Sequence, residues 1–232
     1  MGGAGMKIAV LQFPGSNCDQ DAFQLFAGGL GLPTRYVWHK DTALGDVDLV
    51  ALPGGFAYGD YLRCGAIARF SPIMAAVREF AARGGLVFGI CNGFQVLCEA
   101  GLLPGALIRN SCLEFRCQMC ELTVEASSAA FSPAVLGASL RLPIAHGEGN
   151  YRIDPTGLEQ LEANRQILLR YAHNPNGSLG GIAGIRNRAG NVFGLMPHPD
   201  RAFERFHASR DGLPFARAVL AAQFPEFQKK SA

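Results

Sequence analysis

Residues 86–98 have the sequence LVFGICNGFQVLC, and the interpretation of the whole chain starts from this stretch. An apolar run leads to a cysteine between two glycines, and an amphipathic run follows, which predicts a buried strand, a sharp turn and a helix. The spacing Gly89-x-Cys91-x-Gly93 matches a nucleophile elbow with cysteine in place of serine. The turn is strained and needs small flanking residues. The backbone N–H after Cys91 then faces the sulfur, where it can stabilise an oxyanion.

The alternative for Cys91 is a small buried hydrophobe, which is a common place for a free cysteine. Here the two glycines, the apolar run before them and the helix-forming run after them all agree with the elbow. A helix N-terminus close to the sulfur also favours a reactive thiolate. We therefore predict that Cys91 is a nucleophile.

Length and charge limit the class of protein. With 232 residues, 49% of them hydrophobic, the chain can bury a sizeable core. The formal charge of +2 gives no reason to expect nucleic acid or an anionic membrane as a partner. No apolar run approaches the roughly 18 residues that span a bilayer. Residues 1–5 lack the pattern of a signal peptide, so we expect a disordered leader there and a cytoplasmic protein without membrane contact.

The seven cysteines are an odd number, and without a secretion signal we expect reduced thiols. Cys117 and Cys120 have a CxxC spacing, but a structural zinc site needs a second such pair, which the sequence lacks. In an extended segment these two side chains also point to opposite faces. The sequence therefore predicts no metal site.

Short apolar runs and amphipathic runs alternate through the first hundred residues, which predicts strands over 7–12, 34–38, 47–52 and 86–90 and helices over 20–30, 72–83 and after Cys91. This alternation is typical of an α/β fold with a mainly parallel sheet and helices on both faces. Ligands of such sheets bind beyond the carboxyl ends of the strands. Pro53-Gly54-Gly55 and Cys91 both follow strands, so we expect them to converge.

After residue 107 the pattern changes. Further strands are predicted over 122–124, 140–145 and 167–172, with a hairpin formed by 180–185 and 191–196 and a closing helix over 214–224. The C-terminal part is thus expected to be richer in antiparallel strands. We find no linker or internal repeat, and a single domain over 1–232 is the simplest prediction.

A thiolate nucleophile needs a base, and the base needs an orienting group. His198 is the best candidate because it follows an apolar run, lies between two prolines and has Asp200 two residues on. In an extended segment residues i and i+2 share a face, so Asp200 can hold the imidazole. A surface-loop histidine is the alternative. His146 is the reserve base, whereas His39 follows Trp38 in a polar context and is expected to be exposed.

Two arginine–carboxylate groups have two interpretations each. Asp60 and Arg63 lie in an unusually aromatic loop over 56–65, and Glu114 and Arg116 follow Asn110-Ser111. Each pair is either solvated and worth little, or binds the carboxylate and amino groups of a substrate.

These motifs match a known family. The stretches that carry the match are GICNGFQ (89–95), MPHP (196–199), QFPGSNCD (12–19), PGGFAYGDYLR (53–63) and HGEG (146–149). Over nearly the whole chain the sequence resembles class I glutamine amidotransferases and, within them, the glutaminase subunits of phosphoribosylformylglycinamidine synthase. The resemblance implies a flavodoxin-like sheet. It also implies that Cys91 attacks the amide carbon of L-glutamine and forms a glutamyl thioester.

The resemblance assigns further roles. His198 is expected to act as acid and base, and the Gly55 and Asn92 N–H groups to form the oxyanion hole. The residues expected to bind glutamine are Gln95, Asn110, Ser111 and Phe115. The family usually has glutamate where this chain has Asp200, and the shorter side chain must lie closer to the imidazole. We expect Asp200 to orient His198, with Glu204 as the alternative.

The resemblance also implies partners. Ammonia passes to a separate synthetase subunit, which uses ATP and Mg to convert formylglycinamide ribonucleotide to the amidine in purine synthesis. A small third subunit bridges the two, and this chain itself is expected to need no cofactor. Two competing hypotheses remain: a cysteine peptidase or thiol hydrolase on a similar sheet, and a non-catalytic binding subunit. The motif matches along the chain disfavour the first, and the presence of Cys91, His198 and a carboxylate disfavours the second.

Overall fold

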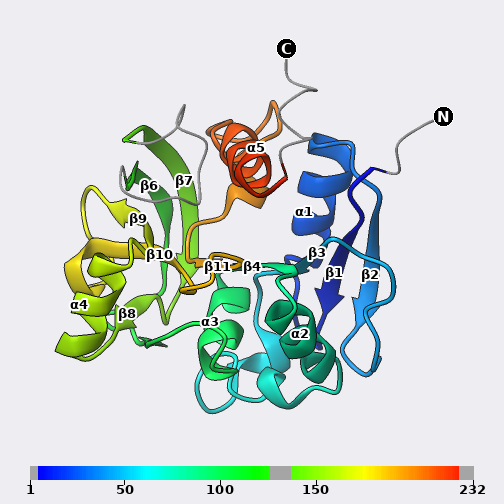
Figure 1. The fold of residues 1–232 in the computed structure, drawn as a ribbon. Coiled ribbons are helices and arrows are strands. Elements are labelled where there is room, and N and C mark those ends of the chain that lie inside the picture. Colours follow the sequence, from blue (N-terminus) through cyan, green and yellow to red (C-terminus); the bar gives the residue numbers. More distant parts are fainter. Residues whose placement is uncertain (1–4, 126–136, 225–232) are drawn as a thin grey trace.

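A nine-stranded mixed sheet organises the computed structural model, which describes residues 5–125 and 137–224 (Figure 1). The strand order is β2-β1-β3-β4-β11-β10-β9-β6-β7, and a separate pair is formed by β5 and β8. The strands are β1 (Ile8–Gln12), β2 (Thr34–Trp38), β3 (Leu49–Leu52), β4 (Leu86–Ile90), β5 (Ala106–Ile108), β6 (Arg116–Val124), β7 (Ser139–His146), β8 (Asn150–Arg152), β9 (Ile167–Tyr171), β10 (Ile182–Arg186) and β11 (Val192–Leu195). The α-helices of the described residues are α1 (Asp19–Gln24), α2 (Ile73–Ala82), α3 (Asn92–Glu99), α4 (Pro155–Ala163) and α5 (Gly212–Gln223).

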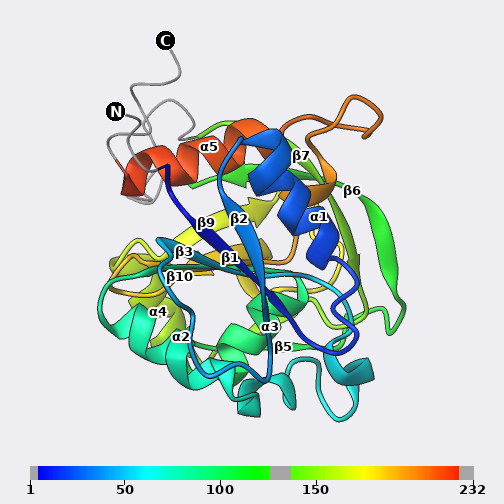
Figure 2. The same ribbon diagram turned by 90° about the vertical axis from the view of Figure 1, so that its right-hand side faces the viewer.

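The first half of the sheet is parallel. Strands β2, β1, β3, β4 and β11 all pair in parallel, and every residue of β3, β4 and β11 is buried. Figures 1 and 2 show α1 and α5 on one face of these strands and α2 and α3 on the other. Strands covered on both faces become continuous apolar runs, which is why the sequence predicted them well. The predicted α/β class with helices on both faces is confirmed.

The second half is antiparallel, as predicted. Strands β10 and β11 form the expected hairpin around residues 187–190, and β9, β6 and β7 continue the sheet with antiparallel pairing. Strand β6 is longer than the predicted segment 122–124, because its first residues alternate weakly and gain their pairing from β7. Within β6, Cys117 is exposed and Cys120 is buried, so the two thiols do lie on opposite faces.

Among the strands and α-helices of the described residues, β5, β8 and α4 were not predicted. Strands β5 and β8 are only three residues long, and α4 buries only Leu161. Such elements carry no amphipathic pattern, although α4 has a clear start signal: the Asp154 side chain accepts a hydrogen bond from the Gly157 N–H at 2.8 Å, and Pro155 opens the helix. The helix predicted over 20–30 is α1 followed by a π-helical segment, Leu25–Gly29. Residues 1–4 of the predicted leader lie outside the described residues, and none of the helices described is long and apolar enough to cross a membrane.

The turn between β4 and α3 has the predicted elbow geometry. Cys91 adopts φ 50° and ψ −105°, a backbone conformation that residues with a side chain rarely adopt. The following helix starts very close to β3, since a Cβ atom placed on Gly93 would lie 2.0 Å from the Leu52 carbonyl oxygen. Only glycine therefore fits at position 93, and its absence of a side chain lets the helix start directly beside the strand ends.

Gly93→Ala is expected to destabilise the fold by about 3 kcal/mol, because the backbone of β3 or α3 must shift to accept the methyl group. The measurement is urea unfolding followed by circular dichroism. Gly84→Ala is the matched control. Gly84 has φ +88° and open space around it, so alanine there meets only the backbone penalty of about 1 kcal/mol. Equal losses in the two variants would contradict the close approach.

Candidate active site

Cys91 lies at the carboxyl end of β4 and immediately before α3, where it is only 4% exposed. Its N–H donates to the Leu195 carbonyl at 2.7 Å, so the cysteine is held against the end of β11. Its thiol donates a long hydrogen bond to the Ala145 carbonyl at 3.7 Å. The chain that leaves β11 leads directly to His198, which explains how residues far apart in sequence meet at this edge of the sheet.

His198 is 1% exposed, and its N–H donates to the Pro143 carbonyl at 2.8 Å. Its Nδ1 lies 3.0 Å from Asp200 Oδ1, whereas Nε2 is buried and has no hydrogen-bond partner among the described residues. A Cβ atom on Gly54 would lie 2.7 Å from His198 Cε1 and 3.4 Å from Cys91 Cβ. The ends of β3, β4 and β11 therefore bring the predicted nucleophile and the predicted base against the same glycine.

The environment of His198 favours the imidazolium. Burial lowers the pKa of His198, but the charge of Asp200, the neighbouring Cys91 and the hydrogen bond to Asp200 raise it to about 10. At neutral pH this ring carries a proton beside the sulfur. The carboxylate that faces it is Asp200, which is buried; the Glu204 N–H instead donates to His207 Nδ1. The structure thus brings Asp200, and not Glu204, to the imidazole.

The residues expected to supply oxyanion donors are Gly55, which follows the Gly54 that contacts Cys91, and Asn92, which follows Cys91 in the chain. Gly55 has φ +125°, and a Cβ atom there would lie 2.6 Å from the Asn17 N atom. Asn92 is the first residue of α3, so its N–H has no intrahelical acceptor. The Asn92 side chain accepts from the Ala57 N–H at 3.2 Å and donates to Gln95 Oε1 at 2.9 Å. This arrangement fixes the loop after β3 to the start of α3.

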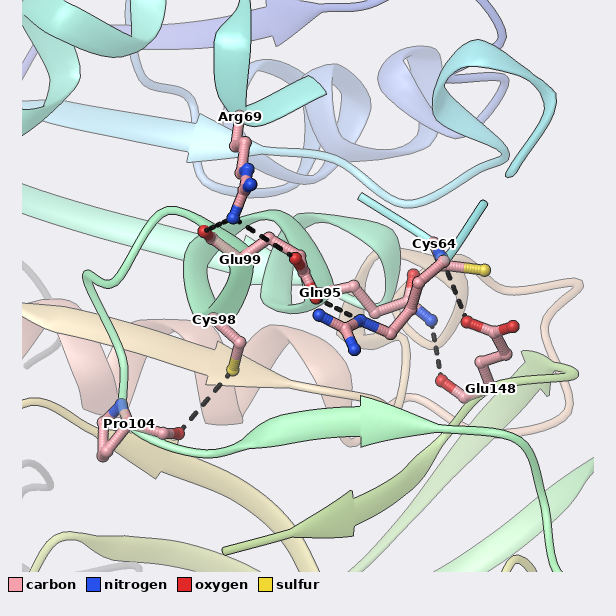
Figure 3. A network of polar contacts seen from close by, with 8 residues as sticks. Cys64, Arg69, Gln95, Cys98, Glu99, Pro104 and Glu148 are labelled. Carbon is pink, nitrogen blue, oxygen red and sulfur yellow. Dashed lines mark hydrogen bonds and ion pairs between the residues drawn. The ribbon is translucent and has the colours of Figure 1, made fainter. Parts of the chain in front are cut away.

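Gln95 links α3 to the turn after β7. Its Nε2 donates to the Glu148 carbonyl at 2.7 Å, and the Glu148 carboxylate accepts from the Cys64 N–H at 3.0 Å (Figure 3). Farther along α3, Glu99 pairs with Arg63 and Arg69. Loop 56–65 is therefore fastened to the helix that carries the nucleophile at its start. The sequence alone does not indicate this role of Glu148, because its contacts join segments that are far apart in the chain.

The two predicted arginine–carboxylate pairs differ from each other in the structure. Arg63 pairs with Glu99 instead of Asp60. Arg116 lies 3.5 Å from Glu114, and the side chains are 37% and 69% exposed, which matches the solvated interpretation. Asp60 instead lies 3.4 Å from the Asn92 amide, and burial and then the charge of Glu148 raise the pKa of its carboxyl.

The predicted glutamine-binding residues after β5 differ in how exposed they are. Asn110 is fully buried, and its amide donates to the Glu114 and His146 carbonyls and accepts from the Gly149 N–H. Its side chain therefore holds the turn together. Ser111 is exposed, and Phe115 is half exposed with its ring 6.3 Å from that of Phe56.

His146, the reserve base, is buried behind this turn. Its Nδ1 lies 3.2 Å from Asn110 Oδ1. Burial and then the charge of His198 lower the pKa of His146 to about 4, so the ring is neutral at pH 7. His39 was predicted to be exposed, and this is wrong: it is 5% exposed, with Nδ1 2.7 Å from the Tyr58 hydroxyl. Loop 56–65 covers it, a long-range contact that the polar sequence around His39 does not reveal.

The lowered pKa of His146 predicts a loss of stability in acid. In the unfolded chain His146 binds a proton near pH 6.5, whereas in the folded chain it binds one only near pH 4. The contribution of His146 to stability therefore falls as pH decreases through this range. Between pH 7.5 and 5 the expected loss is about 2 kcal/mol. His198, whose raised pKa has the opposite effect over this range, is present in both proteins, so the difference between them isolates His146. Urea unfolding at both pH values should show that the change in stability is less favourable by about 2 kcal/mol in the natural chain than in His146→Gln. Identical losses in the two proteins would contradict a neutral buried His146.

Two other kinds of site are relevant in the part of the chain that the structure describes: a metal site and a separate cavity. The described residues contain no group of three or more His, Cys, Asp or Glu side chains that could hold a metal ion. A hollow of about 970 Å³ is lined by residues 101–106, by α4 and by the turn at Asn187, and includes neither Cys91 nor His198. Its aspartate, Asp154, already caps α4, so the hollow contains no catalytic constellation.

Known proteins share both the sequence and the fold. Residues 5–212 match the model of the CobB/CobQ-like glutamine amidotransferase domain. The chain is 59% identical to phosphoribosylformylglycinamidine synthase subunit PurQ of Synechococcus elongatus over 93% of this chain and 98% of the relative. PurQ of Moorella thermoacetica is 57% identical, with 93% of this chain and 95% of the relative covered.

Solved structures agree. The structure of PurLQS from Thermotoga maritima contains a chain that is 42% identical, with a TM-score of 0.82, covering 96% of this chain and 99% of that one. The glutaminase domain of Trypanosoma brucei CTPS, 15% identical with a TM-score of 0.59 over 94% of this chain and 93% of that one, shares the fold. The chain therefore belongs to the CobB/CobQ-like class I glutamine amidotransferases and, within them, to the PurQ glutaminase subunits of phosphoribosylformylglycinamidine synthase.

Proposed function

We propose that this chain hydrolyses L-glutamine to glutamate and ammonia through a thioester on Cys91. The single observation that carries the proposal is that a strained, buried cysteine at the end of β4 and the buried His198–Asp200 pair after β11 lie against the same glycine, Gly54. Nucleophile, base and orienting group are the parts that covalent acyl transfer requires. Family membership supplies the substrate class.

In the first half of the reaction the Cys91 thiolate attacks the side-chain amide carbon of glutamine and forms a carbon–sulfur bond. The carbonyl oxygen becomes an oxyanion, for which the Gly55 and Asn92 N–H groups are the proposed donors. His198 Nε2, which has no hydrogen-bond partner among the described residues, gives its proton to the amide nitrogen. The carbon–nitrogen bond then breaks, and ammonia leaves.

In the second half the neutral His198 takes a proton from a water molecule, whose oxygen attacks the thioester. The carbon–sulfur bond breaks, glutamate leaves, and Cys91 returns as the thiolate beside a protonated imidazole. Throughout, Asp200 accepts from Nδ1 and stabilises the imidazolium. The new carboxyl group of glutamate releases its proton to solvent, so the net reaction is glutamine plus water to glutamate, ammonia and a proton.

We place the glutamine substrate at the edge of the sheet where Cys91 and His198 lie. Gln95 stands one helical turn after Cys91, and it supports the turn containing Glu148. Ser111 and Phe115 lie on the exposed loop before β6 and are the proposed outer contacts of the glutamine backbone. Asn110 would then act by shaping this loop, because protein atoms already occupy its amide.

The proposed partners are a PurL-type synthetase and a PurS-type small protein, since the similar Thermotoga maritima chain is part of PurLQS. In this proposal the synthetase uses the ammonia, with ATP and Mg, to make formylglycinamidine ribonucleotide for purine synthesis. This chain needs no cofactor of its own, and the assembly works in the cytoplasm.

The experiment is to purify this chain together with both partners, the PurL-type synthetase and the PurS-type protein, and to measure glutamate release and amidine formation. Ammonium chloride is the internal control, because it should support the synthetase without this chain. Glutamine should replace the ammonium salt only when this chain is present. Failure of glutamine together with success of ammonium would overturn the proposal, and cleavage of peptides without glutamine turnover would favour a peptidase.

A further inference from the structure

Asp200 is the carboxylate that contacts the His198 imidazole, and only one of its two oxygens has a hydrogen-bond partner among the described residues. Oδ1 contacts His198 Nδ1, but Oδ2 is buried and has no hydrogen-bond partner among the described residues. A buried carboxylate is costly unless a nearby charge compensates it. The next residue, Arg201, is a cation on the same turn.

Arg201 is fastened by two contacts to the segment that follows β1. Its Nε donates to Asp21 Oδ2 at 2.8 Å, and its Nη2 donates to Cys18 Sγ at 3.1 Å. Burial lowers the pKa of Arg201, but the hydrogen bond to Asp21 and the charges of Asp21 and Asp200 help to raise it above its usual value. Burial raises the pKa of the Cys18 thiol, so Cys18 is a neutral acceptor.

Cys18 in turn touches the wall of the site. A Cβ atom on Gly54 would lie 3.3 Å from Cys18 Sγ and 2.7 Å from His198 Cε1. The sulfur therefore lies against the same glycine as the imidazole. A continuous set of contacts runs from Asp21 through Arg201 and Cys18 to the space beside His198.

We propose that Arg201 is a positioning residue that fixes the His198–Asp200 pair, and that Asp21 and the Cys18 sulfur hold its guanidinium in place. The inference rests on the proposed glutaminase function. The guanidinium fork suits this role because it contacts two partners in fixed directions, which the point charge of lysine cannot do. The Arg201 and Asp21 side chains are 35% and 38% exposed, so their ion pair adds little stability and the variants should fold.

Loss of positioning and loss of charge have opposite effects on His198. Removing a nearby positive charge, by itself, raises the pKa of the imidazole. Loosening Asp200 lowers that pKa, because the carboxylate is what stabilises the imidazolium. The other groups that face this pair stay the same in both cases: Cys91 before α3, His146 at the end of β7 and Cys18 before α1.

The test uses this chain in complex with its synthetase and small bridging protein, and compares Arg201→Gln, Arg201→Lys and Asp21→Asn. The control is Arg205→Gln, an exposed arginine four residues on. In Arg201→Gln we expect kcat for glutamine to fall about tenfold to hundredfold, as for other supporting residues, while KM changes less than about threefold. The rate of Cys91 alkylation by iodoacetamide is also measured as a function of pH, because the change in this rate at alkaline pH follows the loss of the proton from His198. In Arg201→Gln this alkaline limb of the pH–rate curve should move to lower pH.

Asp21→Asn changes the net charge in the opposite direction but should also lower kcat, whereas Arg201→Lys should be intermediate and Arg205→Gln unchanged. An alkaline limb that stays in place or moves to higher pH in Arg201→Gln would overturn the inference. If that variant does not fold, Asp21→Asn decides, and an unchanged kcat there overturns it. Failure of the natural complex to hydrolyse glutamine would instead contradict the proposed function itself.

Discussion

Cys91→Ala is expected to reduce glutamine hydrolysis by about 10⁵- to 10⁶-fold while the fold stays intact. A covalent mechanism has no substitute for its nucleophile, and removal of such a group alone costs nearly as much as removal of the whole constellation. Steady-state release of glutamate by the assembled complex measures the loss. Amidine formation from ammonium chloride should be unchanged, because it does not use Cys91. Hydrolysis within tenfold of the natural rate would end the thioester proposal.

The same position offers a test of backbone strain. Cys91 adopts φ 50° and ψ −105°, a conformation that costs on the order of 1–3 kcal/mol for a residue with a side chain. Glycine is normally less stable than alanine by about 0.5–1 kcal/mol in a regular element. At this elbow the order should be reversed, so Cys91→Gly should melt at or above the temperature of Cys91→Ala. Ala76→Gly in α2, an ordinary helical position, is the control and should lower the melting temperature.

The elbow could be predicted from sequence because all its determinants are local. An apolar run, two glycines at fixed spacing and an amphipathic run are enough to predict the strand, the turn and the helix. The parallel strands were equally accessible, since strands buried on both faces are continuous apolar segments. His198 and Asp200 were identified by their i, i+2 spacing in a segment assumed to be extended. The structure confirms the contact, at 3.0 Å, but the extended backbone is wrong, because Pro199–Arg201 form a 3-10 helix.

What the sequence did not provide were contacts between loops. Asn110 was expected to bind substrate, but its side-chain amide hydrogen-bonds to the turn after β7, which lies about forty residues later in the chain. His39 was expected to be exposed because its neighbours are polar, whereas Tyr58 covers it. Cys18 and Arg201 are far apart in the sequence, but Arg201 Nη2 lies 3.1 Å from Cys18 Sγ. The hydrophobic periodicity of the sequence does not predict such a contact. Short elements such as β5 and β8 also lack the length to show a pattern.

Asp200→Asn is expected to lower kcat for glutamine by about 10²- to 10⁴-fold with little change in KM. The corresponding change in a serine protease triad costs about 10⁴ because the amide holds the wrong tautomer of the imidazole. Here the carboxylate also sustains the imidazolium, since its charge and hydrogen bond help to raise the pKa of His198 to about 10. Asparagine should therefore return that pKa towards its usual 6.5.

The sign of the pH effect follows from linkage. A pKa raised by folding contributes stability that is fully present below pH 6.5 and is lost as pH rises through about 10. In Asp200→Asn this alkaline loss should disappear, and the alkaline limb of Cys91 alkylation should move to lower pH. Glu204→Gln is the matched control, because the Glu204 backbone, and not its carboxylate, makes the contact with His207. Asp200→Glu keeps the charge and should retain more activity than Asp200→Asn. If Glu204→Gln proved more damaging than Asp200→Asn, the orienting role would belong to Glu204, and the buried carboxylate at 200 would need another explanation.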